Sequence, residues 1–232
     1  MRAKPTVLRV GGGPLVVDLD DTKGKEIADL LGAAFEHDPG FQTSARATGE
    51  RGRRRIHAIL EASLSMHLAG RNRVRGVYHD GRLVAVACVR SPDGSLPKWA
   101  AVGALSRLAW VAGPGVLFRV LRRSLPTYSQ HPSEPHHFLA KLAVHPAYQR
   151  RGLARALLED LHDWSAESGS AGVALDNGNP ENVPFYESFG YRVTHHARIA
   201  DMELWWMFRP NDPTEKPGST EDGQPPQGKG KG

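Results

Sequence analysis

The sequence has a single cysteine, Cys88, among 232 residues. One thiol cannot form an intrachain disulfide framework, and it cannot supply a four-cysteine zinc site. Sparse use of cysteine is typical of proteins from a reducing compartment. We therefore expect a cytoplasmic protein whose fold depends on its apolar core, since 40% of the residues are hydrophobic.

No hydrophobic run is long enough to cross a bilayer, which takes about 20 apolar residues. The nearest stretch, 99–120, contains Arg107 and Arg119 and is interrupted by Gly113-Pro114-Gly115. The first ten residues hold one short apolar cluster and no small-residue cleavage site, so we expect no secretory signal. We predict that a membrane is not a partner.

The last 22 residues, 211–232, lack aliphatic and aromatic side chains and are rich in Pro and Gly. Such a segment cannot offset the entropy of ordering. We predict a disordered tail at 211–232, a flexible arm at 1–14, and one folded domain at 15–210. No internal repeat is visible.

The net charge is +5, from 30 Lys and Arg against 25 Asp and Glu. Arginines cluster at 51–55 and at 71–75, but neither cluster has the interleaved aromatic side chains of a platform for single-stranded nucleic acid. The clusters are typical of a solvated basic face, so we predict that nucleic acid is not a partner.

Helical and strand-like periodicities alternate along the domain, which is typical of an α/β fold. The spacing of apolar residues predicts helices over 22–37, 56–68, 105–121, 152–168 and 183–189. Strands are predicted over 15–19, 74–79, 82–89, 137–144, 171–175, 191–193 and 203–207. Thr22 is the expected cap of the first helix, and Asp80-Gly81 is a hairpin signal.

The segment from Leu142 to Leu158 carries the clearest chemical signal. A strand ends in a short turn, Gln149-Arg150-Arg151-Gly152-Leu153-Ala154, from which a helix starts. The first turn of a helix has unpaired N–H groups and partial positive charge, so it binds anions. The turn is neither a Walker loop nor a dinucleotide fingerprint, because it lacks the Gly-Lys-Ser/Thr ending and the further glycines.

This turn resembles motif A of the GNAT N-acetyltransferase superfamily, Gln/Arg-x-x-Gly-x-Gly/Ala. About 30 residues on, the stretch from Asn179 to Tyr191 resembles the family's motif B, Asn-x₆-Tyr-x₃-Gly-Phe. Ala154 replaces the second glycine and Tyr191 replaces the usual Phe. Within the superfamily the chain is most similar to the puromycin N-acetyltransferase-like branch. The resemblance implies a single acyltransferase domain: a mixed, mostly antiparallel twisted sheet flanked by helices, with a helical insertion before the central strand.

The resemblance also implies an acetyl-CoA site. The backbone of Leu142, Ala143 and Val144 would hold the pantetheine arm and polarise the thioester, and Asn179 and Asn182 would contact the cofactor. The pyrophosphate would lie on the motif A turn, which comprises Gln149, Arg150, Arg151, Gly152, Leu153, Ala154 and Arg155.

Tyr186 matches the family's general acid, which protonates the leaving thiolate and so also contacts the cofactor. A phenol with a pKa of about 10 can exchange a proton with a thiol of about 8.5 when the two are in contact. Candidates for the base that takes a proton from the amine are Glu36, His37 and Asp38 at the end of the first helix, and His136 or His137 at the start of the central strand. A water-mediated base is an alternative. Phe35, Asp38 and His136 are expected to line the acceptor site.

His145, His195 and His196 lack the paired spacing of a zinc helix, so no metal is predicted. The leading hypothesis is acetyl-CoA-dependent N-acetylation of a small-molecule amine. Two alternatives stay open: a protein or peptide N-acetyltransferase, and a non-catalytic module that binds coenzyme A or nucleic acid. The sequence leaves the acceptor, the acyl length and the choice between monomer and homodimer undetermined.

Overall fold

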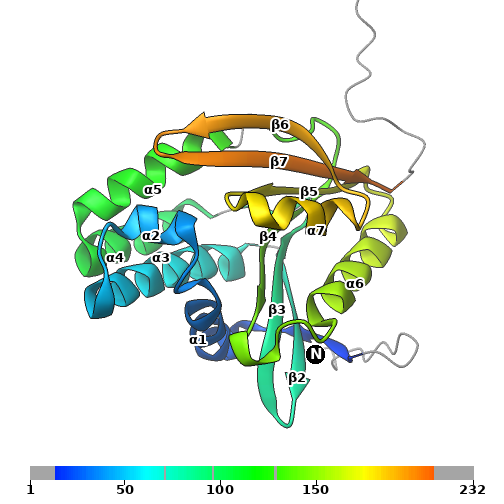
Figure 1. Cartoon of the computed structure of the whole chain (residues 1–232), viewed down its shortest axis with the longest axis horizontal. Helices are drawn as coiled ribbons and strands as arrows, with labels where there is room; N and C mark the ends of the chain where they lie inside the picture. Colours follow the sequence, from blue (N-terminus) through cyan, green and yellow to red (C-terminus); the bar gives the residue numbers. More distant parts are fainter. Residues whose placement is uncertain (1–13, 71, 96, 128–129, 212–232) are drawn as a thin grey trace, which may run out of the picture.

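The computed structural model describes residues 14–70, 72–95, 97–127 and 130–211, with the side chains of 125–127 left out. A seven-stranded sheet runs through this part of the chain in the order β1-β2-β3-β4-β5-β7-β6 (Figure 1). All neighbouring strands are antiparallel except β4 and β5, which are parallel. The strands are β1 (Val16–Leu19), β2 (Arg73–His79), β3 (Arg82–Arg90), β4 (His137–Val144), β5 (Gly172–Asn177), β6 (Arg192–Ile199) and β7 (Met202–Pro210).

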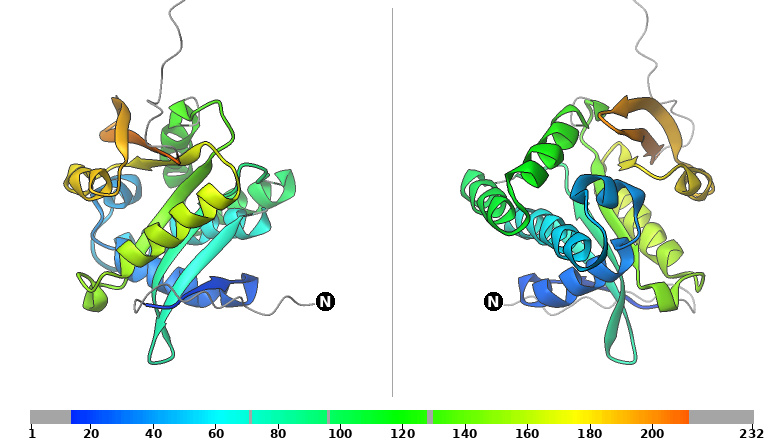
Figure 2. Two further views of the ribbon diagram at one scale, coloured as in Figure 1. Left: turned by 90° about the vertical axis from the view of Figure 1, so that its right-hand side faces the viewer. Right: turned by 60° about the vertical axis from the view of Figure 1, so that its left-hand side comes forward.

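Helices cover both faces of the sheet. On one face lies α6 (Leu153–Glu167); on the other lie α1 (Gly24–Phe35) and α3 (Gly49–Ala69), with α4 (Lys98–Ala112) and α5 (Pro114–Thr127) packed beyond them (Figure 2). The short helices are α2 (Pro39–Ala45), α7 (Val183–Glu187), η1 (Asp21–Lys23), η3 (Pro146–Tyr148) and η4 (Pro180–Asn182). The predicted α/β class and mixed sheet are confirmed, and α4 and α5 form the predicted helical insertion before β4.

The buried strand β3 shows why the sequence folds into layers. Successive side chains of a strand point to opposite faces. Ala85, Ala87 and Val89 pack toward α6, whereas Val86 and Cys88 pack toward α1 and α3. A strand covered on both sides needs this continuous apolar run.

The parallel pair β4 and β5 separates soon after it forms. The only registered partners of the two strands are His137 with Val173 and Phe138 with Ala174, among the residues described. On its other edge, β4 stays paired with β3 as far as Val144. One edge of β4 is therefore left open toward β5 from Leu139 onward.

A buried ion-pair cluster joins three elements. The guanidinium of Arg75 in β2 lies 2.7 Å (Nε–Oδ2) from Asp160 of α6 and 2.9 Å from Asp18 of β1. The side chains of Arg75 and Asp160 are only 7% and 10% exposed. A charge this well buried is tolerated only when it is paired.

Several local predictions need correction. Thr22 does not cap a helix through its side chain; Asp20 caps η1, and α1 starts at Gly24. The helix α2 was not predicted, although Asp38 and Pro39 are a typical N-cap and first helical residue. The strands β6 and β7 extend well beyond the predicted ends, because they pair with each other along a hairpin.

The predicted arm and tail lie almost wholly outside the described residues. Asn211, assigned to the tail, is described and is fixed to the domain: its N–H donates to Ala171 O, and its Nδ2 donates to Ser170 O at 2.7 Å. No helix within the described ranges combines the length and apolarity needed to cross a membrane.

Candidate active site

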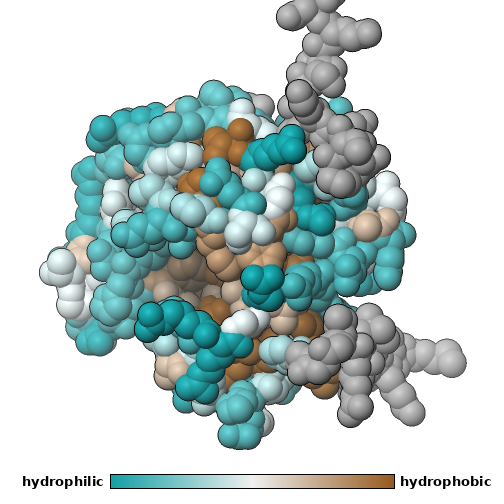
Figure 3. Space-filling model, turned by 45° about the vertical axis from the view of Figure 1, so that its right-hand side comes forward, coloured by the Kyte–Doolittle hydropathy of each residue, from teal (hydrophilic) through white to brown (hydrophobic). Residues whose placement is uncertain are grey.

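A cavity of about 480 Å³ lies where β4 and β5 separate, between the sheet and helices α3, α4 and α5. It is also bordered by the end of α1, by α2, and by the segment from Gly178 to Tyr186. Figure 3 shows a hollow with brown, hydrophobic walls in the visible face, surrounded by hydrophilic side chains. Concave, mostly apolar cavities with a few convergent polar groups are the usual sites for small ligands.

The sheet side of the cavity carries two charged groups. Lys141 of β4 and Asp176 of β5 both line it, together with Tyr186 of α7. Asp176 is accessible from the cavity, yet desolvation by the surrounding protein raises the pKa of its carboxyl. The Lys141, Arg90 and Arg123 cations oppose this rise. Burial lowers the pKa of the Lys141 ammonium, against the opposing effects of Cys88 and Asp176.

Arg123 of α5 fixes the short helix α2 beside the cavity. Its guanidinium donates to Gly40 O at 2.6 Å and contacts Ser44 Oγ. Asp38 caps α2 by accepting from Phe41 N at 3.1 Å, and the rings of Phe35 and Phe41 are 5.0 Å apart. The predicted acceptor residues Phe35 and Asp38 thus both line the cavity.

The motif A turn has the backbone geometry that an anion site needs. Gly152 adopts φ +79°, immediately before the first residue of α6, and no side chain caps that helix. A Cβ built at Gly152 would meet nothing within 4 Å, so the space in front of the turn is open. Gln149 Nε2 lies 3.4 Å from Val144 O, and the Arg151 guanidinium lies over the ring of Tyr148.

Tyr186 is held by aromatic packing. Its ring lies 5.3 Å from that of Phe185 and 5.7 Å from that of Tyr191. Burial, and secondarily the Asp176 carboxylate, raise the pKa of the Tyr186 phenol, so the hydroxyl stays protonated at neutral pH.

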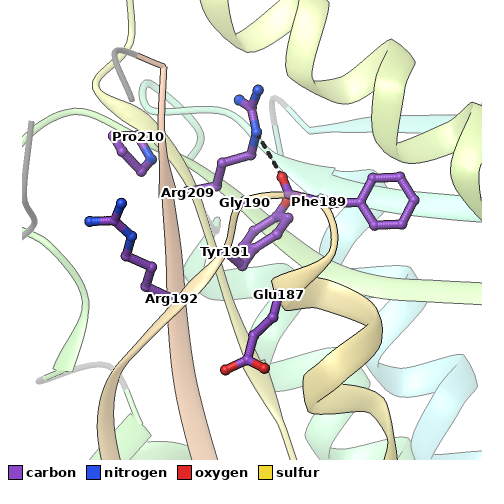
Figure 4. Close-up of a pocket in the computed structure, with 7 residues that line it drawn as sticks. All are labelled: Glu187, Phe189, Gly190, Tyr191, Arg192, Arg209 and Pro210. Atoms are coloured by element: carbon purple, nitrogen blue, oxygen red, sulfur yellow. Dashed lines mark hydrogen bonds between the residues drawn. The ribbon is translucent and has the colours of Figure 1, made fainter. Parts of the chain in front are cut away.

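A second depression of about 440 Å³ lies between the loop that follows α7 and the end of β7 (Figure 4). The residues that line it show how α7 is anchored to the sheet. The Nε of Arg209 donates to Phe189 O at 3.1 Å, which ties the loop after α7 to β7. Glu187, Arg192 and Pro210 also line this depression, whereas Tyr186 does not. We therefore assign the depression to the support of α7.

Three predicted residues lie elsewhere. His137 is 1% exposed, contacts Ser170 Oγ at 3.0 Å and packs on Trp164, on the α6 side of the sheet. Burial lowers its pKa to about 4. His136 contacts Glu134 O, and Glu36 lies 3.5 Å from Arg53. None of the three lines the cavity, so the structure does not support His137 or Glu36 as the base or His136 as an acceptor contact.

The predicted asparagines differ from each other. The side chain of Asn179 accepts from Glu181 N and caps η4, whereas Asn182 lines the cavity. Asn177, which the sequence did not single out, exchanges hydrogen bonds with the backbone of Asn179 and so shapes this loop.

The sequence analysis also missed the two charged cavity residues of the sheet, Lys141 and Asp176. Each is the only charged residue of its strand, HFLAKLAV and GVALDN. A charged residue is rare in a strand that is buried on both faces, so a single charge in such a strand could have indicated these two site residues. No group of three or more His, Cys, Asp or Glu side chains that could hold a metal ion occurs within the residues described.

Comparison with known proteins agrees with this architecture. The family model "Acetyltransferase (GNAT) family" matches residues 42–191. A glucosamine 6-phosphate N-acetyltransferase from Trypanosoma brucei brucei is 36% identical over 63 residues, which are 27% of this chain and 41% of that protein.

Two solved structures share the fold. One, from Corynebacterium glutamicum, is described as histone acetyltransferase HPA2 and related acetyltransferase; it is 21% identical, with a TM-score of 0.63 over 85% of this chain and 96% of that one. The other is a GCN5-related N-acetyltransferase from Rhodopseudomonas palustris, which is 14% identical, with a TM-score of 0.53 over 88% and 99% of the two chains. The chain therefore belongs to the acetyltransferase (GNAT) family, as its two motifs predicted.

Proposed function

We propose that this protein transfers the acetyl group of acetyl-CoA to the amine of a small molecule, with Tyr186 as the general acid. The observation that carries the proposal is a cavity that Tyr186 lines beside the open edge of β4. The uncapped start of α6, which follows β4 in the chain, adds a place for the pyrophosphate. Members of this family use acetyl-CoA as the acyl donor.

The residues present fit acetyl-CoA. The N–H groups of residues 150–155 would receive the pyrophosphate, because a helix start with an open glycine turn binds phosphate. The unpaired edge of β4 near Leu142, Ala143 and Val144 would hold the pantetheine arm and direct a backbone donor at the thioester oxygen. Tyr186, protonated at neutral pH, would donate its proton to the departing thiolate.

A small acceptor suits the cavity better than a protein chain does. Helices α3, α4 and α5 wall the cavity on the side away from the sheet, where a peptide substrate would require an open groove. The match to a glucosamine 6-phosphate N-acetyltransferase also favours a small-molecule acceptor. We further propose that the protein works in the cytoplasm, where its single, buried Cys88 would stay reduced.

Calorimetry with two matched glycine variants tests the cofactor site. Gly152 and Gly169 both have positive φ, and a Cβ at either would meet open space. Gly152→Glu should abolish acetyl-CoA binding, because its carboxylate would occupy the pyrophosphate position. Gly169→Glu, which lies beyond the opposite end of α6, should bind acetyl-CoA like the wild type. Folded wild-type protein that gives no binding heat, or a Gly152→Glu variant that binds equally well, would contradict the proposal.

A further inference from the structure

We propose that the acceptor is a monoamine carried on an apolar body, and that Asp176 binds its ammonium and takes its proton. This inference rests on the proposed acetyl transfer and names the substrate class and the base for it.

The cavity is divided by polarity. Its helical wall consists of apolar side chains from α3, α4 and α5, apart from two serines and Arg123: Ile59, Ala62, Met66, Ala101, Leu105, Leu108, Val120 and Leu121. The sheet contributes Lys141, Asp176 and Asn177, where β4 and β5 separate. An acceptor that fits both ends has its amine at the sheet and an apolar body against the helices.

Asp176 is the carboxylate placed for this role. Only two carboxylates line the cavity among the described residues, Asp38 and Asp176. Asp38 is already used as the cap of α2. Asp176 and Tyr186 line the same cavity, and the Asp176 carboxylate contributes to the raised pKa of the phenol. Acetyl transfer needs both groups near the reacting carbon.

The charges around Asp176 limit the acceptor to one amine. Lys141 on β4, Arg90 on β3 and Arg123 on α5 act on the Asp176 carboxylate, and Tyr186 faces it from α7. A second ammonium against the helical wall would lie among mostly apolar side chains and the Arg123 cation, with no carboxylate among the described residues of that wall. A sugar phosphate would place several hydroxyl groups against the same wall, where two serines and Arg123 are the polar side chains described.

The proposed step balances. One ammonium proton passes to the Asp176 carboxylate, and the neutral nitrogen then forms a bond to the thioester carbon. The C–S bond breaks, and the thiolate takes the phenolic proton of Tyr186. The second nitrogen proton restores the phenol, and Asp176 releases its proton to solvent. The sum is one amide, one thiol and one proton.

Asp176→Asn is the direct test, since it keeps the shape of the side chain and removes the base. With 2-phenylethylamine as the probe, kcat/KM at pH 7 should fall about 10²- to 10⁴-fold. Calorimetric affinity for acetyl-CoA should be unchanged, while affinity for 2-phenylethylamine in the presence of coenzyme A should fall at least tenfold. Asp163→Asn, which alters an exposed carboxylate on α6, is the matched control and should behave like the wild type.

The pH profile separates a base from a structural residue. Below the ammonium pKa of about 10, the free-amine fraction rises tenfold per pH unit. The deficit of Asp176→Asn should therefore shrink steadily between pH 7 and pH 9, because solution supplies the neutral amine. A deficit that stays constant with pH, or no deficit at all, would overturn the assignment of Asp176.

A substrate panel tests the acceptor class. Wild-type protein should acetylate 2-phenylethylamine or tryptamine with a kcat/KM at least tenfold above that for glucosamine 6-phosphate or spermidine. Preference for the sugar phosphate or the polyamine would overturn the inference and leave the acetyl transfer standing. Failure to release thiol with any amine would contradict the transfer itself.

Discussion

At the scale of single residues, the proposed general-acid role of Tyr186 concerns the end of acetyl transfer. A phenol whose pKa is raised by burial and by Asp176 keeps its proton at neutral pH. The thiolate formed as the C–S bond breaks would take that proton, and the proton then lost from the acetylated nitrogen would restore the phenol. The residue is therefore suited to a step that occurs late in the reaction.

We predict that Tyr186→Phe lowers kcat by about 10²- to 10⁴-fold, the usual contribution of a positioned acid. Acetyl-CoA affinity should be nearly unchanged, because the ring keeps its packing against Phe185 and Tyr191. Steady-state thiol release and calorimetry would measure the two quantities. Tyr148→Phe removes a hydroxyl from a half-buried tyrosine outside the cavity and is the control. A Tyr186→Phe variant within about twofold of wild-type kcat, with chemistry rate-limiting, would make Tyr186 structural.

The sequence predicted some site residues and missed others for a physical reason. Tyr186 and the motif A turn could be found because the family pattern fixes their spacing. Asp176 and Lys141 belong to no such pattern: they meet only because β4 and β5 diverge, and divergence of two strands is a property of the folded sheet. His137 was chosen for its chemistry, but a residue's place in the pleat decides its face, and His137 faces α6.

At the scale of elements, Arg75 links β1, β2 and α6 and so holds the start of the sheet against the helix that carries motif A. Removing one partner of a buried ion pair leaves a charge without compensation.

We expect Arg75→Leu to lower the free energy of unfolding by about 3–5 kcal/mol, because Asp160 would stay buried without its partner. Chemical denaturation would measure the change. The double variant Arg75→Leu/Asp160→Leu should recover much of the loss, since no buried charge is left unpaired; the Asp18 side chain is 44% exposed and is solvated. If the double variant were as unstable as the sum of the two single variants, the pair would not be coupled.

Elements were predicted best where the sequence pattern is local. The strand 137–144 and the helix near 152–168 match β4 and α6 within a residue or so, since each has a long apolar pattern and a clear end. The strand β6 was predicted over 191–193 only. Most of its residues are exposed, so the strand is defined by pairing with β7 rather than by an apolar alternation of its own.

At the scale of the whole molecule, buried neutral histidines make stability depend on pH. Burial, and secondarily the Arg209 cation, lower the pKa of His162 to about 3, and Nε2 of His162 lies 3.0 Å from the hydroxyl of Tyr191. Burial also lowers the pKa of His67 to about 4. An unfolded histidine titrates near 6.5, so between about pH 6.5 and pH 4 the unfolded chain binds more protons, and acid favours unfolding.

We predict that the melting temperature is level above pH 7 and falls steadily from pH 6.5 to pH 4. His162→Gln keeps a hydrogen-bonding group for Tyr191 but cannot titrate, so its melting temperature should fall less over the same interval. The two pH series compare directly by differential scanning calorimetry. Parallel slopes in wild type and variant would rule out a contribution from His162.

Chain truncation tests where the domain ends. Because the residues beyond Asn211 have no apolar side chains, we propose that they add no stability, and a chain ending at Asp212 should melt within about a degree of the full chain. A chain ending at Pro210 should melt lower, since it loses the hydrogen bonds of Asn211 to Ala171 and Ser170. Equal melting temperatures for the two truncations would contradict the contribution of Asn211, and a large drop for both would show that the tail stabilises the domain.

The most direct test of acetyl transfer is to count both products in one reaction. Wild-type protein would be mixed with acetyl-CoA and 2-phenylethylamine, and free thiol and N-acetylated amine would be quantified together over time. We predict one acetylated amine for each thiol released, with both products absent for Gly152→Glu. Thiol release without acetylated amine would mean that the bound thioester is hydrolysed by water, and it would contradict acetyl transfer to an amine.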